Sequence, residues 1–341
     1  MTDANGEIGG WLARQLELVE SLIDDVASAG EPKPSFHDQL VSRRSKRLRS
    51  LVLLLASRAG DPGRAIEQDL VRAAATVELL HEGTLYHDDI VDLADRRRGL
   101  PTTHAVHGPA VAALAGSELL YRSAELVAML PPASRRAYGR AGDALCRGQL
   151  RELEAIGDQG LTPRQRIRIM RDKTAGLFAF AAATGAQLGG ARPTVVRRLR
   201  RFGLRFGLCY QLADDLRDLT ASEGELGREP GADLADGVMT LPILLALAQG
   251  GPEARAVCNA LRRPRHRDDI VEALGTLRAG RGIELAEGVL HVWAEQAVHE
   301  LTATALEARH AVRELHDLMA DVVRLATGTG TAFPRITTCT M

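Results

Sequence analysis

The chain is poor in aromatic residues, in lysine and in long apolar runs. Only 4% of its 341 residues are aromatic, and three lysines stand against 40 arginines. Apolar runs such as 51–56 fall far short of the roughly 18–20 residues that cross a membrane, so no transmembrane segment is expected. Residues 1–10 lack the basic-then-apolar pattern of a secretory signal. We therefore predict a cytoplasmic protein.

Neither the charge nor the cysteines indicate a nucleic-acid binder or a cross-linked scaffold. The formal net charge is −1, without the basic excess that nucleic acid requires, so no nucleic-acid partner is expected. The four cysteines are Cys146, Cys209, Cys258 and Cys339, and none forms a CxxC or Cys/His metal spacing. Free thiols in a reducing cytoplasm are the simplest interpretation.

Helical periodicity runs through almost the whole chain. The predicted helices cover residues 11–26, 35–56, 65–94, 109–130, 133–156, 163–188 and 193–219, and the chain is again helical from 241 to 325. Alternating strand patterns are almost absent. Short loops favour antiparallel neighbours. We predict one all-α domain over residues 1–326 with about ten or more helices, a polar loop at 224–237 and a flexible tail at 327–341.

Two acidic clusters interrupt strongly apolar helices. Asp88 and Asp92 are four residues apart, and so are Asp214 and Asp218. Like charges at this spacing share one helical face and repel, so each cluster needs a compensating cation. One such cluster is explained as a solvated acidic face. Two clusters of the same DDxxD form instead favour a site where Mg²⁺ joins carboxylates to substrate phosphates.

Basic residues accompany these clusters. Arg96–Arg98 follow the first cluster at the predicted helix end, where cations also suit the helix dipole. Lys46 lies close to Arg49, and Lys173 precedes Thr174 on an otherwise apolar helix. Because arginine replaces lysine almost everywhere else, these two lysines indicate compact point charges for phosphate groups.

The motifs, taken in order, resemble those of the trans-isoprenyl diphosphate synthases, or polyprenyl synthetases, over about residues 15–325. The matching strings are Lys46–Arg49, Val77–His81, His87–Asp92, Arg97–Gly99, Pro101–Thr102, Lys173–Ala175, Gln211–Asp218, Gly231–Leu234 and Thr240–Pro242. One DDxxD motif is a weak signal, whereas this ordered set is highly specific. The resemblance implies an all-α isoprenoid-synthase bundle around a deep central cavity, usually a homodimer. It also implies head-to-tail condensation of isopentenyl diphosphate with an allylic diphosphate.

The resemblance further implies a role for each site residue. The positions for three Mg²⁺ ions are Asp88, Asp89, Asp92, Asp214, Asp215 and Asp218. The allylic diphosphate positions are Arg97, Lys173, Thr174, Gln211 and Arg228, and the isopentenyl diphosphate positions are Lys46, Arg49, His81 and Arg98. The residues implied in catalysis are Asp88, Asp92, Lys173, Thr174, Gln211 and Asp214.

One departure from the family pattern removes a phosphate-binding lysine. The usual Gly-Lys before Thr-Leu-Pro is here Gly237-Val238, and Arg228 replaces a second lysine in the preceding loop. The absent lysine predicts weaker binding of the allylic diphosphate without a change of reaction type.

Product length is predicted from two small residues beside the first cluster. Gly83 and Thr84 stand where bulky aromatic side chains stop chain growth in the family, so geranylgeranyl diphosphate or a longer polyprenyl diphosphate is expected. Close helix packing through small residues would produce the same pattern.

Two other functions stay open. A non-catalytic, prenyl-diphosphate-binding subunit of a heteromeric synthase is disfavoured because both aspartate clusters are kept. A class I terpene cyclase is disfavoured by the second DDxxD motif and by the low aromatic content.

Overall fold

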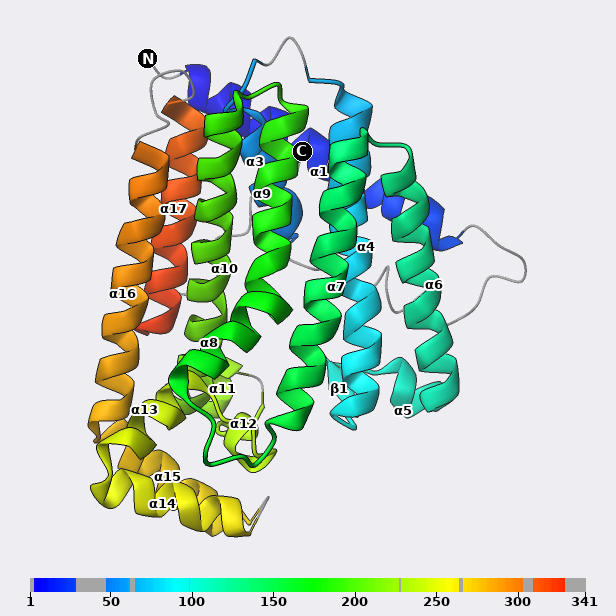
Figure 1. The fold of residues 1–341 in the computed structure, drawn as a ribbon. Coiled ribbons are helices and arrows are strands. Elements are labelled where there is room, and N and C mark those ends of the chain that lie inside the picture. The colour runs from blue at the N-terminus through cyan, green and yellow to red at the C-terminus, as the bar shows by residue number, and fades with distance from the viewer. Residues whose placement is uncertain are drawn as a thin grey trace.

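The structure is a computed structural model that describes residues 3–28, 47–61, 65–97, 99–226, 228–263, 266–302 and 309–328. Its longest helices stand side by side, and shorter ones cover one end of the bundle (Figure 1). The helices are α1 (Asp3–Ser28), α3 (Leu48–Ser57), α4 (Glu67–Val91), α5 (Thr103–His107), α6 (Pro109–Ala128), α7 (Pro132–Glu154), α8 (Pro163–Met170), the π-helix η1 (Arg171–Ala175), α9 (Gly176–Leu188), α10 (Pro193–Thr220), α11 (Glu223–Leu226), α12 (Ala232–Ala235), α13 (Leu241–Gln249), α14 (Gly251–Arg262), α15 (Arg267–Arg278), α16 (Arg281–Thr302) and α17 (Arg309–Ala326).

The predicted all-α fold is confirmed. In the described part of the chain the only sheet is a short hairpin, in which β1 (Arg96–Arg97) pairs antiparallel with β2 (Leu100–Pro101). No helix within the described ranges has both the length and the apolar character needed to cross a membrane. Most of the predicted tail and the start of the predicted helix at 35–56 lie outside the described residues.

Prolines start many of these helices. The first or second positions of α6, α7, α8, α10, α13 and α14 hold Pro109, Pro132, Pro163, Pro193, Pro242 and Pro252. Proline suits this position because its fixed φ matches the helix and its missing N–H has no intrahelical acceptor there. The start of α8 also has a capping box, in which Thr162 and Gln165 satisfy each other's backbone N–H groups. This start places the residues that follow it in the site.

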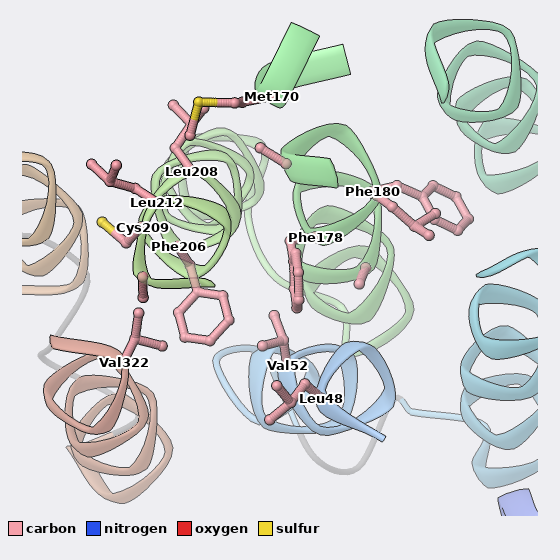
Figure 2. Packing of buried hydrophobic residues seen from close by; sticks show 14 of the residues in the cluster. Leu48, Val52, Met170, Phe178, Phe180, Phe206, Leu208, Cys209, Leu212 and Val322 are labelled. Atoms are coloured by element: carbon pink, nitrogen blue, oxygen red, sulfur yellow. The ribbon is translucent and has the colours of Figure 1, made fainter. Parts of the chain in front are cut away.

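Among the phenylalanines of the described residues, three are fully buried in the core. Phe178 of α9 and Phe206 of α10 meet edge to face with ring centroids 5.1 Å apart, and Phe202 lies beside Phe206. Val52 of α3 points toward this pair (Figure 2). Helix α9 packs against both α3 and α10. Helices α4, α7 and α10 all run toward the end of the bundle where α8, α11 and α12 lie (Figure 1). The fold thus brings both aspartate clusters to the same end.

One long predicted helix is interrupted, and the helical region predicted from 241 to 325 is divided into several helices. The segment 163–188 contains a π-helical turn at Arg171–Ala175, between α8 and α9. The segment 241–325 is divided among α13 to α17. Single π turns inside helices are frequent at functional sites, and this one carries Lys173 and Thr174.

Two cysteines are expected to differ in reactivity because one is buried and the other is exposed. Cys209 is fully buried on α10, and burial raises the pKa of its thiol to about 12, whereas Cys146 on α7 is exposed. The thiolate is the reactive form of cysteine, and a thiol with a pKa of about 12 stays protonated at pH 8, so Cys209 is unreactive at this pH. We expect iodoacetamide at pH 8 to label Cys146 in the native protein and Cys209 only after unfolding, as measured by peptide mass spectrometry. Native labelling of Cys209 would contradict this packing.

Candidate diphosphate and metal site

The first aspartate cluster lies at the C-terminal end of α4. The last turn of this helix has no basic residue, so its carboxylates face the negative end of the helix dipole. Burial raises the pKa of Asp88, and Lys173 and Arg97 only partly oppose it. Burial and the neighbouring Asp88 raise the pKa of Asp92 to about 6. Both carboxyl groups therefore lie where an added cation is favoured.

Asp89 of the first cluster is paired with an arginine. Its buried carboxylate accepts a 2.5 Å hydrogen bond from Nε of Arg97, which the short hairpin after α4 brings back to the helix. Asp89 and Arg97, predicted on separate subsites, thus form one ion pair in this structure.

The second cluster lies near the C-terminal end of α10 and is partly enclosed by the following loop. Asp214 is exposed, whereas Asp215 and Asp218 are buried. Arg228 lies 2.9 Å from Oδ1 of Asp218, and the backbone N–H of Asp233 donates to Oδ2 at 3.1 Å. The polar loop predicted from sequence therefore contributes contacts that hold the cluster in place.

Asp233 is a further carboxylate of the second cluster that was not predicted as a ligand. Burial raises its pKa well above the ordinary value, and the neighbouring Asp218, Asp215 and Asp214 raise it further. The string Gly231–Leu234 did carry this signal, because it contains an aspartate next to a turn. The second cluster is therefore more crowded with acid groups than its DDxxD motif indicates.

A chain of contacts runs from the second cluster to Lys173, which interacts electrostatically with Asp88 of the first cluster. Lys173 is hydrogen-bonded to Oε2 of Glu152 on α7, and the pKa of this lysine is raised by Glu152 and Asp88, which outweigh its burial. Oε1 of Glu152 accepts a 2.6 Å hydrogen bond from Arg166, and Arg166 lies 3.5 Å from Oδ2 of Asp215. Glu152 and Arg166 were not predicted as site residues.

A second set of hydrogen bonds orders the predicted allylic-side residues. Thr174 donates to the amide oxygen of Gln211 at 2.8 Å, and the amide nitrogen of Gln211 donates to Asp215 at 2.8 Å. Thr174 lies on η1 and Gln211 on α10, one turn before the second cluster. The π turn therefore places Lys173 and Thr174 toward Glu152 and Gln211, respectively.

A close helix contact makes this arrangement possible. A Cβ added to Gly148 of α7 would lie 2.4 Å from the backbone nitrogen of Lys173, so only glycine fits where α7 meets η1. This contact places Glu152, one turn further along α7, beside Lys173. The glycine was visible in the sequence, but its reason is the close approach of two helices.

The predicted isopentenyl diphosphate residues are only partly described. Lys46 and Arg98 lie outside the described residues. Arg49 on α3 is half-buried with its guanidinium 4.8 Å above the ring of Phe178, and His81 on α4 is also half-buried. Arg49 and His81 thus come from α3 and α4, which pack against each other.

Gly83 and Thr84, the two small residues predicted at the product tunnel, have different surroundings. A Cβ on Gly83 would lie 2.8 Å from the carbonyl oxygen of Gly116 on α6, so Gly83 is explained by close packing between α4 and α6. Thr84 is half-buried and donates to the carbonyl oxygen of His81 at 2.7 Å. Thr84 is also one helical turn before Asp88, on the same face.

The donor set suits a hard divalent cation, although it is not preassembled. All six predicted metal ligands are carboxylates, the oxygen donors that Mg²⁺ prefers. Throughout the described ranges, no group of three His, Cys, Asp or Glu residues is close enough to hold an ion on its own. Such a site needs further oxygen ligands from a substrate, as is usual for Mg²⁺ with phosphates.

Comparison with known proteins agrees with this geometry. The polyprenyl synthetase family profile matches residues 35–277. The chain is 36% identical to nonaprenyl diphosphate synthase of Mycobacterium tuberculosis over 285 residues, which cover 83% of this chain and 84% of the relative. It is 32% identical to octaprenyl diphosphate synthase of Escherichia coli over 272 residues, covering 79% and 80% of the two chains.

A solved structure matches the fold over nearly the full length. The polyprenyl synthase of Caulobacter crescentus, crystallised with calcium and isoprenyl diphosphate, superposes with a TM-score of 0.84 at 30% identity and covers 95% of this chain and 98% of its own. The family profile and the relatives both span the two aspartate clusters and the residues that connect them. The chain belongs to the polyprenyl synthetase family.

Proposed function

We propose that this chain condenses isopentenyl diphosphate head-to-tail with an allylic diphosphate. The observation that carries the proposal is that both aspartate clusters lie at one end of the bundle (Figure 1), where Glu152 and Arg166 link Lys173 to the second cluster. The retained clusters also favour a catalytic chain over a regulatory subunit. The three cysteines of the described residues are free thiols, which agrees with a reducing cytoplasm, where we place the reaction.

The carboxylates fit Mg²⁺, and three ions are proposed. Asp88, Asp92 and Asp214 would hold them, with Asp89, Asp215 and Asp218 in support. The raised pKa values of Asp88, Asp92 and Asp233 support this assignment because they indicate acid groups with too little positive charge nearby. When bound, the ions would neutralise the diphosphate leaving group.

The protein's own residues position the substrates and stabilise charge. Lys173 and Arg97 would turn from Glu152 and Asp89 to the allylic diphosphate when it binds, and would stabilise its growing charge as the C–O bond breaks. The allylic cation forms beside the hydroxyl of Thr174, which Gln211 holds in place. The alkene of isopentenyl diphosphate then attacks the cation, and the released diphosphate accepts the proton that is lost.

The reaction is tested with the full chain, Mg²⁺, isopentenyl diphosphate and each of three allylic primers, namely dimethylallyl, geranyl and farnesyl diphosphate. Mass spectrometry should detect products lengthened by whole isoprene units. Absence of elongation with every primer, from protein that is folded by circular dichroism, would refute the proposal.

We propose geranylgeranyl diphosphate or a longer polyprenyl diphosphate as the product, and Thr84 as a residue at the growing tail. Thr84→Phe adds bulk one turn from Asp88 and should shorten the main product by at least one isoprene unit, as measured by product mass. Thr84→Val keeps the size but removes the hydrogen bond to His81, so it should leave the length unchanged. An unshortened product of Thr84→Phe would place the tunnel elsewhere.

We propose that the protein is a homodimer that pairs through α6. Leu114 and Tyr121 lie seven residues apart on one face of this helix, and both are more than 70% exposed. Large apolar side chains that recur along one exposed helix face indicate an interface. Light scattering should give twice the chain mass of 36.7 kDa, and Leu114→Glu with Tyr121→Glu should give the monomer. The alternative outcome is a complex with a different partner chain, because one relative, 32% identical to this chain, is named heptaprenyl diphosphate synthase component 2 (Geobacillus stearothermophilus).

A further inference from the structure

Arg166 is a buried cation that the proposed chemistry does not use directly. Only 3% of its side chain is exposed, and its guanidinium lies between Glu152 at 2.6 Å and Asp215 at 3.5 Å. Buried arginine is found almost only where it is paired, because an unpaired buried charge is costly. Its position therefore needs an explanation in terms of the two carboxylates that it contacts.

Glu152 is shared by two cations. One of its carboxylate oxygens is bound to Lys173 and the other to Arg166. Lys173 and Arg166 are seven residues apart, so they project to the same side of α8 and η1. Burial alone would raise the pKa of Glu152, but Lys173 and Arg166 lower it below the ordinary value, so Glu152 is a carboxylate.

This sharing matters when a diphosphate arrives. Lys173 can turn to the diphosphate only by leaving Glu152, which is largely buried. If Lys173 were the only partner of Glu152, its departure would leave a largely buried carboxylate without a counter-charge, which is strongly unfavourable. With Arg166 in place, Glu152 keeps a partner at 2.6 Å.

We propose that Arg166 is a positioning residue that holds Glu152 and Asp215 and thereby frees Lys173 to bind the allylic diphosphate. This inference rests on the proposed function of the site. It also supplies a cation next to the second cluster in a chain where Val238 stands in place of the lysine that the family resemblance predicts.

The test compares Arg166→Met with Arg166→Lys and with Arg168→Met, an exposed matched control on the same helix. Arg166→Met should raise the KM for the allylic diphosphate about tenfold or more and leave the KM for isopentenyl diphosphate unchanged. Arg166→Lys keeps the charge and should recover most of the loss. A purely structural role would lower kcat without changing either KM, and would overturn the proposal.

A direct binding measurement gives a readout that does not depend on turnover. Calorimetry of the full chain with inorganic diphosphate and Mg²⁺ should show about tenfold weaker binding in Arg166→Met and unchanged binding in Arg168→Met. Adding Glu152→Gln to Arg166→Met removes the buried carboxylate that retains Lys173, so this double variant should bind diphosphate more tightly than Arg166→Met. If Arg166→Met does not fold, the double variant and Arg166→Lys still provide the comparison.

The outcomes separate this inference from the proposed function. If the unaltered chain elongates a primer and Arg166→Met keeps its diphosphate affinity, the inference alone is wrong. If the unaltered chain binds diphosphate but elongates nothing, and Arg166→Met weakens the binding, the proposed reaction is wrong and the positioning role stands.

Discussion

Replacing Asp88 by asparagine is expected to lower kcat about 10³-fold. The change removes one negative charge and almost no volume at the end of α4, where burial already raises the pKa of the carboxyl group. The remaining amide is a weaker ligand for a hard cation, so charge on the departing diphosphate is less well neutralised. Steady-state elongation assays over a range of Mg²⁺ concentrations should show the loss in kcat together with a higher Mg²⁺ requirement.

The control for this variant lies on the same segment. Asp95→Asn removes an equivalent charge from an exposed position seven residues further along and should change kcat by less than about twofold. The melting temperature of Asp88→Asn without Mg²⁺ should equal or exceed that of the unaltered protein, because a carboxyl group with a raised pKa favours the neutral form. An active Asp88→Asn enzyme would place the metal elsewhere.

The sequence was sufficient for the helices and for the aspartate clusters. Periodicity and proline positions show where most helices begin. The repulsion between Asp88 and Asp92, and between Asp214 and Asp218, indicates that each pair requires a cation. These signals are local, because they depend on residues one or two turns apart. The two clusters could therefore be recognised before it was known that α4 and α10 finish at the same end of the bundle.

The contacts between clusters could not be predicted in the same way. Glu152 and Arg166 look like ordinary residues of charged helices, and their roles arise only because α7, η1 and α10 meet at one end. The π turn that places Lys173 has no sequence rule of its own. Gly83 was noticed in the sequence, but two reasons for a small residue there were possible, an open product tunnel or close helix packing. The structure explains its small size by the close contact with Gly116.

A second large effect is expected at the start of α3, from the loss of Arg47. This buried side chain makes 2.6 and 2.7 Å hydrogen bonds to Glu20 and lies 3.8 Å from Glu78 and 4.0 Å from Glu82, both almost fully buried on α4. Its backbone φ of 47° is left-handed, a conformation that a non-glycine residue adopts at a cost. The ion pairs thus stabilise an entry to α3 that the backbone alone disfavours.

Arg47→Met should therefore lower the free energy of unfolding by about 3–5 kcal/mol, because it leaves the two α4 carboxylates buried without this counter-charge. Circular dichroism melting should show a decrease of about 5–10 °C, against less than about 1 °C for Arg140→Met at an exposed position. Adding Glu78→Gln and Glu82→Gln removes the buried charges and should restore at least half of the loss. If these changes lower stability further, packing of the arginine stem, and not charge pairing, would be what holds α3 against α4.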